Sequence, residues 1–122
     1  MSLGKIGELL AANYLVSKKW KILEKNWFNS KGYRIGELDL IAEDTRGELI
    51  FVEIKTRKGR LAEMAPGENL NPAKLKKIVK IAQSFLNLKQ WQGRNWRIDL
   101  IEVTVDFGKR NFSLRHTKAI HF

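Results

Sequence analysis

Acidic side chains are concentrated in one short stretch of this otherwise basic chain. Six of the thirteen acidic residues fall within 17 residues: Glu37, Asp39, Glu43, Asp44, Glu48 and Glu53. Side chains two residues apart in a β-strand share a face, so Glu37 lies with Asp39 and Glu53 lies with Lys55. Two carboxylates beside a lysine can hold a divalent cation and activate water against a phosphate. This spacing therefore predicts metal-assisted hydrolysis of a phosphodiester.

The loop between the two acidic runs decides whether their carboxylates meet, because a one-residue change of register turns every side chain to the other face. The β-prone runs 35–42 and 49–56 flank turn-forming residues, which predicts a hairpin. Gly47 stands where a three-residue loop, 45–47, needs a left-handed residue, so we predict that loop. It opposes three pairs: Asp44 with Glu48, Asp39 with Glu53, and Glu37 with Lys55. A loop of two or four residues would oppose Asp39 to Val52 and separate the carboxylates.

Opposed carboxylates need a compensating charge, since two of them about 5 Å apart repel by roughly 3 kcal/mol at an effective dielectric near 20. Oxygen ligands from Asp39 and Glu53, together with the backbone carbonyl of Ile54 and retained waters, would suit Mg²⁺ or Mn²⁺. Lys55 would hold a water, or help to deprotonate it, for attack on a phosphate. The alternative is a solvated sheet face on which Glu37 and Lys55 form a cross-strand ion pair worth about 0–1 kcal/mol.

The hairpin must be positioned by the elements around it. Apolar residues at helical spacing predict a first helix over about 4–18, and β-prone residues predict a strand over 20–28. After the hairpin, residues 57–70 contain glycine and proline and are long enough to be a functional loop.

A second helix and two strands complete the predicted order. Asn71 is placed to cap a helix with Pro72 at its first position and one apolar stripe. A strand over 96–107 shows a slip in its apolar alternation near Ile101, which indicates a bulge or burial on both faces. Residues 112–116 predict a last short strand. This order predicts an α/β domain with a mixed sheet and a right-handed crossover through the second helix.

Size and composition narrow the classes of function. A length of 122 residues favours one domain, 1–122. Twenty-three Lys and Arg against 13 Asp and Glu give a net charge of +10, with a pI of about 10.0, which favours nucleic acid as a partner. The absence of cysteine excludes a disulfide framework and a Cys nucleophile, and two histidines poorly support a His-rich metal site. The amphipathic N-terminus, with no membrane span or signal pattern, predicts a cytoplasmic protein.

Cationic residues flank the predicted site and cover one face of the second helix, where no acid occurs between positions 71 and 92. The candidate phosphate-binding residues are Arg57, Lys58, Arg60, Lys74, Lys76, Lys77 and Lys80. On duplex DNA each neutralised phosphate would add about 0.9 to the log-log salt slope. Any single lysine here is also explained as part of a solvated helix face. Gln83 could face the site, although we expect a satisfied buried amide. The four tryptophans are expected to pack in the core or at its rim, and His116 and His121 are expected to be structural or exposed.

The segment GELDLIAEDTRGELIFVEIKTR, residues 36–57, resembles the core of the YraN-like uncharacterised bacterial family. That family is similar to archaeal Holliday-junction resolvases and to the restriction-endonuclease-like, PD-(D/E)-x-K, nuclease superfamily. Parts of the first helix and residues 97–103 and 116–122 also resemble the family. The loop at 64–74 departs from the family pattern, and such loops often set substrate geometry.

The resemblance implies roles for individual residues. Asp39 matches the metal-binding aspartate, Glu53 the second acidic ligand and Lys55 the motif lysine. Glu8 on the first helix matches a glutamate that approaches the metal in resolvase-like relatives. Glu37 matches a family position to which we assign no role.

Residue chemistry and resemblance together predict a restriction-endonuclease-like domain, a mixed central sheet flanked by helices. The expected function is that of a Mg²⁺- or Mn²⁺-dependent endonuclease acting on DNA, in a branched or structured form. Junction resolution would require two active sites, which predicts a homodimer. Two alternatives stay open: a non-catalytic nucleic-acid-binding module that retains the acidic hairpin, and a nuclease acting on RNA.

Overall fold

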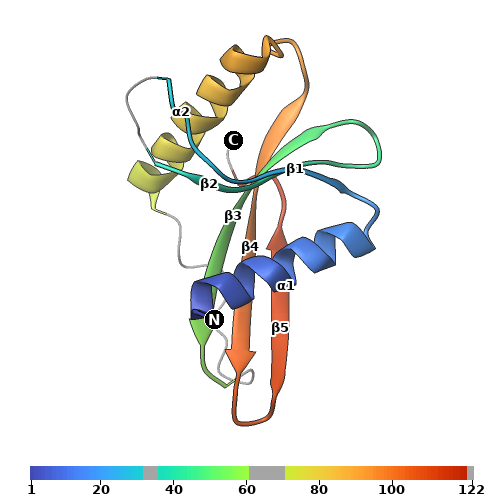
Figure 1. Cartoon of the computed structure of the whole chain (residues 1–122), viewed down its shortest axis with the longest axis vertical. Coiled ribbons are helices and arrows are strands. Elements are labelled where there is room, and N and C mark those ends of the chain that lie inside the picture. Colours follow the sequence, from blue (N-terminus) through green and yellow to red (C-terminus); the bar gives the residue numbers. More distant parts are fainter. Residues whose placement is uncertain (32–35, 61–70, 121–122) are drawn as a thin grey trace.

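The protein is described here by a computed structural model covering residues 1–31, 36–60 and 71–120. Two helices lie on a five-stranded sheet whose strand order follows the chain, β1-β2-β3-β4-β5 (Figure 1). The elements are α1 (Leu3–Ser17), β1 (Lys21–Trp27), β2 (Leu38–Glu43), β3 (Leu49–Lys58), α2 (Pro72–Lys89), β4 (Trp96–Asp106) and β5 (Asn111–Thr117). Strands β3 and β4 are parallel and are joined through α2, whereas the other neighbours are antiparallel. The predicted mixed central sheet flanked by helices is confirmed.

Local sequence signals fix the starts of both helices. The Ser2 side chain accepts a hydrogen bond from the backbone amide of Lys5 at the start of α1, and Asn71 Oδ1 accepts from the amide of Lys74 at the start of α2. Pro72 occupies the first turn of α2 as predicted. The predicted Asn71 cap and the predicted positions of both helices are therefore confirmed.

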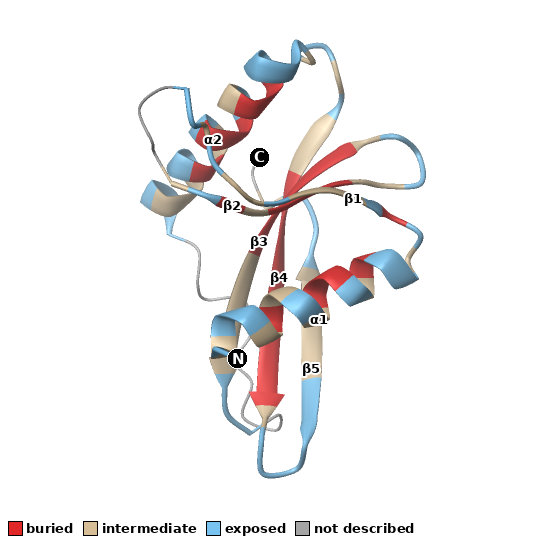
Figure 2. Ribbon diagram, in the orientation of Figure 1, coloured by how far each residue is buried: buried red, intermediate tan, exposed pale blue. Residues whose placement is uncertain are grey.

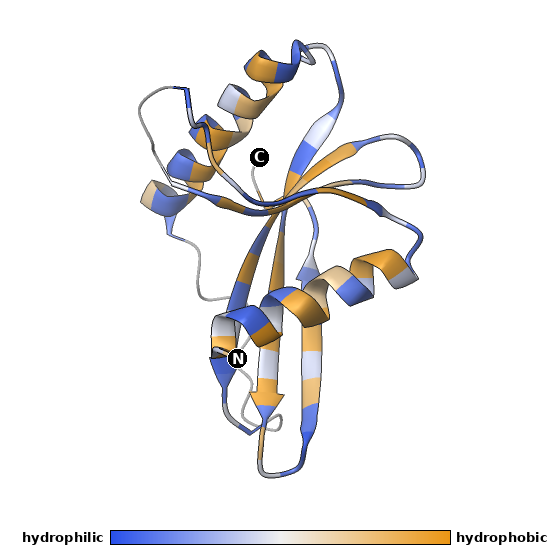
Figure 3. Ribbon diagram, viewed as in Figure 1, coloured by the Kyte–Doolittle hydropathy of each residue, from blue (hydrophilic) through white to orange (hydrophobic). Residues whose placement is uncertain are grey.

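The core consists of two apolar clusters, one on each face of the sheet. On one face α1 packs against residues such as Val52 and Ile101. On the other face α2 packs against residues such as Phe51 and Ile98. Figures 2 and 3 show the consequence, since the buried and apolar parts of β2, β3 and β4 meet at the centre of the sheet.

Strand β4 explains the irregular apolar pattern near Ile101. Eight consecutive residues of β4, from Ile98 to Val105, are buried, and they contribute to both apolar clusters, Ile98 to the one under α2 and Ile101 to the one under α1. The register between β3 and β4 is continuous from Leu49↔Trp96 to Lys58↔Val105. Of the two alternatives, burial on both faces is therefore correct and a bulge in this ladder is not. The register shift lies instead between β1 and β2, at Ile22 and Glu24.

The first turns of α1 lie very close to β3. A Cβ built on Gly7 would stand 1.8 Å from Thr56 Oγ1 and 2.7 Å from Thr56 Cβ. A side chain at position 7 would therefore force the helix away from the strand. This close approach brings the neighbouring residue Glu8 toward the open end of the β2–β3 hairpin, away from its turn.

Candidate functional site

The hairpin of β2 and β3 has the register that the three-residue loop predicts. The pairs run from Glu43↔Leu49 to Leu40↔Val52, and the amide of Asp44 donates to the carbonyl of Glu48. Gly47 has a φ of +84°, the left-handed conformation that this turn requires. The next opposed positions in this register are Asp39 and Glu53, as predicted. The alternative pairing of Asp39 with Val52 is excluded.

The ladder ends just where the acidic residues lie. Beyond Leu40↔Val52, β1 and β2 turn away from β3 and β4, and α1 crosses near this divergence (Figure 1). At this point a side chain and not a backbone carbonyl accepts the hydrogen bond from β3. Asp39 Oδ2 accepts it from the amide of Ile54 at 2.8 Å. β2 begins at Leu38, so Glu37 precedes the strand and the ladder does not extend to the predicted opposition of Glu37 and Lys55.

The environment of Asp39 disfavours its charge. Burial raises the pKa of Asp39 to about 7, and the charges of Glu53 and Glu8 act in the same direction. The hydrogen bond from Ile54 and the charge of Lys74 oppose this rise without cancelling it. Asp39, Glu53 and Glu8 are thus close enough to interact electrostatically, which is the convergence that the sequence predicts.

Glu53 has a partner that sequence reasoning placed elsewhere. The side chain of Glu53 is almost buried, and Lys74 Nζ lies 3.0 Å from Glu53 Oε1. Lys74 is in the first turn of α2, so the crossover helix delivers an ammonium directly to the acidic pair. Lys74 therefore belongs to the site itself, and its ammonium partly balances the carboxylates.

Glu8 and Asp39 line a common cavity of about 280 Å³ between α1 and the edge of the sheet. Cations stand at the same cavity, namely Lys5 and Lys25, and Lys5 Nζ lies 3.6 Å from Glu8 Oε1. The predicted approach of Glu8 to the acidic hairpin is thus a feature of the structure. Lys25 comes from β1, where no sequence pattern marked it.

Lys55 and the basic residues after it extend from the site along β3. Lys55 is half-buried and follows Glu53 by two residues, so both lie on one face of β3. Arg57 Nε donates to Thr104 Oγ1 at 3.3 Å. Lys58 is exposed at the end of the strand, as is Arg60 beyond it.

The predicted basic face of α2 is present, but Gln83 does not reach the site. Lys76, Lys77 and Lys80 are exposed. Gln83 is also exposed and lines an apolar groove along α2, together with Leu75 and Val79. The expectation of a satisfied buried amide at this position is therefore wrong, because Gln83 falls outside the apolar stripe that packs on the sheet.

A buried carboxylate on β4 is a residue that sequence reasoning did not single out. Glu102 is 2% exposed, and neither of its carboxylate oxygens has a hydrogen-bond partner among the described residues. It opposes Lys55 on one side and Arg115 on the other. The signal available in the sequence was an acid within the apolar run of β4. Burying a carboxylate without hydrogen-bond partners costs free energy, so such a residue calls for an explanation.

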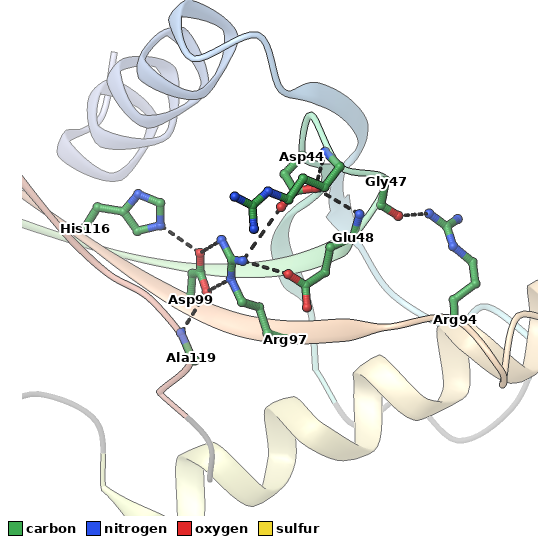
Figure 4. Close-up of polar contacts among 9 residues, drawn as sticks. Asp44, Gly47, Glu48, Arg94, Arg97, Asp99, His116 and Ala119 are labelled. Carbon is green, nitrogen blue, oxygen red and sulfur yellow. Dashed lines mark hydrogen bonds and ion pairs between the residues drawn. The ribbon is translucent and has the colours of Figure 1, made fainter.

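A second polar cluster, on the α1 face of the sheet, accounts for His116. Asp99 is fully buried; His116 Nε2 lies 2.8 Å from Asp99 Oδ2, and Arg97 Nε donates to Asp99 Oδ1 at 2.9 Å (Figure 4). Tyr14 Oη lies 2.8 Å from His116 Nδ1. Burial alone would raise the pKa of Asp99, but the hydrogen bonds from His116 and Arg97 outweigh it and lower that pKa.

The same cluster fastens the hairpin to β4. Arg97 Nη1 also contacts Glu48 at 2.8 Å, and Arg94 Nη2 contacts Glu43 at 2.6 Å and the carbonyl of Gly47 (Figure 4). Three of the six clustered acids are thus structural: Glu43, Asp44 and Glu48 all pair with arginine. The structural role expected for His116 is confirmed, and the tryptophans likewise pack against the core, with Trp27 against Phe85 as an example. His121 lies outside the described residues.

The donor set at the hairpin end suits a hard divalent cation with few protein ligands. Mg²⁺ commonly uses one or two carboxylates and keeps several waters, and Asp39 and Glu53 supply two carboxylates, with the pKa of Asp39 raised by burial first and by the charge of Glu53 second. Within residues 1–31, 36–60 and 71–120, no three acidic, His or Cys side chains form a ready metal cage. Two carboxylates fit a cation that keeps most of its waters.

Comparison with known proteins identifies the relatives of this chain. The chain is 38% identical to a UPF0102 protein of Clostridium tetani over 95% of this chain and 90% of that one. It is 46% identical to UPF0102 protein TTE1452 of Caldanaerobacter subterraneus over 84% of this chain and 79% of that one, and 39% identical to a UPF0102 protein of Chlorobium limicola over 94% and 88%.

One solved structure resembles this chain weakly. It is Pyrococcus furiosus SfsA in complex with Ca²⁺, at a TM-score of 0.41 and 15% identity. The match covers 95% of this chain and 62% of SfsA. That likeness is too low to inform fold or function.

Neither helix among the described residues has the length and apolar character of a membrane span.

The family assignment rests on the sequence. The family model for "Uncharacterised protein family UPF0102" matches residues 7–103, which include the acidic hairpin, Lys55 and Lys74. This chain belongs to the UPF0102 family, the YraN-like family that its motifs resemble.

Proposed function

We propose that this protein is a divalent-metal-dependent nuclease that hydrolyses phosphodiester bonds of DNA. The observation that carries the proposal is the convergence of Asp39 and Glu53 at the end of the hairpin, where burial and like charge raise the pKa of Asp39 to about 7. Carboxylates crowded in this way in a chain of net charge +10 are typical of a site that receives a cation and a phosphate together.

Asp39 and Glu53 would hold Mg²⁺ or Mn²⁺, with Glu8 and the backbone carbonyl of Ile54 as further oxygen donors. When bound, the cation would supply positive charge at a phosphate oxygen and lower the pKa of a water. The amide of Ile54 fixes the Asp39 carboxylate against β3, so that this ligand would need little rearrangement on binding.

Lys55 would position the attacking water or a phosphate oxygen. Its side chain lies on the same face of β3 as Glu53, and the residue is half-buried. Cations further from the acidic pair would bind the backbone on either side of the cleaved bond, each neutralising one phosphate. These are Arg57, Lys58, Arg60, Lys76, Lys77 and Lys80.

The resemblance to junction resolvases favours DNA over RNA and supports a branched or structured substrate. A junction has two strands to cut, so this substrate would require two active sites and hence a homodimer.

A non-catalytic nucleic-acid-binding module is the second candidate, and one observation favours it. Lys74 Nζ already contacts Glu53 at 3.0 Å, and the amide of Ile54 already donates to Asp39. Each acid thus has a partner without a metal. In this case the acidic hairpin would be an element of the fold, and the basic surface alone would bind nucleic acid.

The decisive experiment measures cleavage and metal binding separately. Linear duplex, single-stranded and four-way-junction DNA, and matched RNA, are incubated with the protein in Mg²⁺, Mn²⁺ or EDTA. Asp39→Ala and Lys55→Ala are compared with Glu24→Gln and Lys21→Ala, which change charge on β1 outside the cavity that Asp39 lines. Thermal unfolding with and without Mg²⁺ reports metal binding independently of cleavage.

The nuclease proposal expects metal-dependent cleavage that both site variants lose and both control variants keep. It also expects Mg²⁺ to stabilise the native protein but not Asp39→Ala. Binding that persists in every variant, without cleavage by the native protein of any substrate, supports the binding module instead. Cleavage that survives both site substitutions would show that the site is elsewhere.

A further inference from the structure

The hairpin joining β4 and β5 projects beyond the cover of α1 (Figure 1). Its turn carries Phe107, which is 53% exposed, and the adjoining strand carries Phe112, which is 43% exposed. Between them lie Lys109 and Arg110, both exposed. Figure 2 shows the whole tip as exposed. The tip therefore combines two bare aromatic rings with two cations.

One of the two rings, Phe112, continues a row of side chains that is buried elsewhere. Phe112 lies directly opposite Val105, and Val105 faces the apolar cluster under α1. Phe107 stands in the turn that follows the end of β4 at Asp106. Where α1 covers the row it forms core, whereas past the end of α1 the row meets solvent. The rings are thus available for contact by a partner.

The tip is held in shape before any partner binds. Asp106 Oδ1 accepts a hydrogen bond of 3.1 Å from the amide of Lys109, and the amide of Arg110 donates to the carbonyl of Phe107. A side chain that closes its own turn in this way restricts the turn to one conformation. The aromatic pair would therefore lose little conformational freedom on binding.

The tip also adjoins Lys58, the exposed cation at the end of β3, which lies on the face of the sheet opposite to Glu53. Lys58 opposes Val105 in the parallel ladder, and the amide of Gly59 donates to the carbonyl of Val105. At about 3.3 Å per residue, the five residues from Glu53 to Lys58 span roughly 17 Å. A nucleic-acid strand that rises about 3.4 Å per nucleotide would cover this distance in roughly five or six nucleotides.

We infer that the β4–β5 hairpin tip binds unpaired bases of a nucleic acid by stacking them on Phe107 and Phe112, with Lys109 and Arg110 on the adjoining phosphates. Cations beside exposed aromatic rings suit a single strand, because the cations can bind its phosphates while the rings stack on its bases. A paired base offers no free face, so the tip selects substrates in which a duplex adjoins a gap, fork or junction. This inference rests on the proposed function and assigns its substrate class.

The experiment measures binding in EDTA, so that cleavage does not enter. Fluorescence anisotropy gives the affinity for a fully paired duplex and for the same duplex with a six-nucleotide single-stranded arm. Both are measured for the native protein, for Phe107→Ser/Phe112→Ser, and for Leu88→Ser. Leu88, on α2, is 44% exposed and serves as the matched surface control. 2-Aminopurine at each position of the arm reports stacking by a change in its fluorescence.

We expect the native protein and Leu88→Ser to prefer the armed duplex and to perturb 2-aminopurine at one or two positions. The double variant should lose that preference by roughly tenfold or more, since stacking on one aromatic ring is worth about 1–3 kcal/mol per base. Its affinity for the paired duplex should change little. Circular dichroism and thermal unfolding check that the double variant is folded, and Lys109→Ala/Arg110→Ala provides a second variant that should weaken binding to the arm.

An unchanged preference in the double variant overturns this inference and leaves the nuclease proposal intact. Self-association of the native protein that the double variant loses, with no change in the preference, assigns the rings to a second copy of the chain and also overturns it. Failure of the native protein to bind any nucleic acid overturns both proposals.

Discussion

Ionisation of the Asp39 carboxyl group should lower the free energy of unfolding at neutral pH. We expect Asp39→Asn to raise that free energy, because asparagine carries no charge. Asparagine keeps an acceptor oxygen for the amide of Ile54, which donates to Asp39 Oδ2 at 2.8 Å. It removes the charge that burial, Glu53 and Glu8 all disfavour. The substitution therefore separates the charge of the site from its hydrogen bonding.

The magnitude follows from the pKa of Asp39, which rises from 3.8 to about 7 on folding. Each pKa unit corresponds to about 1.36 kcal/mol, so the ionised carboxylate costs the folded state about 4 kcal/mol above pH 7. Between the two pKa values the folded state binds more protons than the unfolded state, so stability falls as the pH rises through this window. Asp39→Asn should thus match the native protein near pH 4 and exceed it in stability by about 4 kcal/mol near pH 8.

Urea unfolding between about pH 4.5 and 8.5 measures this difference directly. The solutions contain EDTA, because a bound cation would stabilise the ionised carboxylate and mask the effect. Glu24→Gln removes one negative charge from β1 and controls for the change in net charge.

The reasoning is refuted if the stability gap between Asp39→Asn and the native protein stays constant with pH, or if Asp39→Asn is the less stable of the two near pH 8. A gap that Glu24→Gln reproduces would attribute the effect to net charge and not to the site.

Three further substitutions test the structure around the site. Gly7→Ala should destabilise the protein by roughly 1–3 kcal/mol in thermal unfolding, because its Cβ would collide with Thr56. Adding Thr56→Ala should recover part of this loss of stability. If Gly7→Ala causes no loss, the close packing of α1 on β3 is contradicted. Lys74→Met removes the ammonium 3.0 Å from Glu53 and should increase Mg²⁺ affinity several-fold in calorimetry near pH 8, whereas reduced affinity would show that Lys74 does not compete with the cation. Asp99→Asn should destabilise the protein by about 3–5 kcal/mol near neutral pH, since it leaves buried partners unpaired. Folding lowers the pKa of Asp99, so the stability that its carboxylate contributes is present above about pH 4 and is lost as the pH falls through the folded pKa. A difference in urea unfolding between Asp99→Asn and the native protein that does not change with pH would contradict the role of the charged carboxylate.

Much of the local architecture could be predicted from the sequence, including the geometry on which the candidate site depends. Gly47 specifies a three-residue turn, and strict alternation then places Asp39 opposite Glu53. Asn71 and Pro72 likewise mark the start of α2. These features are encoded within a few consecutive residues, because turn geometry and helix capping depend on local φ and ψ angles and neighbouring side chains.

Contacts between distant segments could not be predicted in this way. Lys74 belongs to the site because the first turn of α2 lies beside Glu53 of β3, although its spacing marked it only as one of several helix lysines. Gln83 is exposed where a buried amide was expected, and the apolar slip at Ile101 reflects burial on both faces of β4. Sequence spacing does not show which segments come together across the sheet.

The sequence alone determined which side chains share a strand face, since alternation and a glycine turn leave one register for the hairpin. Only the tertiary structure decided the electrostatics of those side chains. The pKa of Asp39 depends on its burial and on charges up to 35 residues away in sequence, namely Glu8 on α1, which raises it, and Lys74 on α2, which lowers it. The burial of Glu102 has the same origin. Desolvation and Coulomb interaction depend on distance in space, and packing of the two helices on opposite faces of the sheet sets those distances.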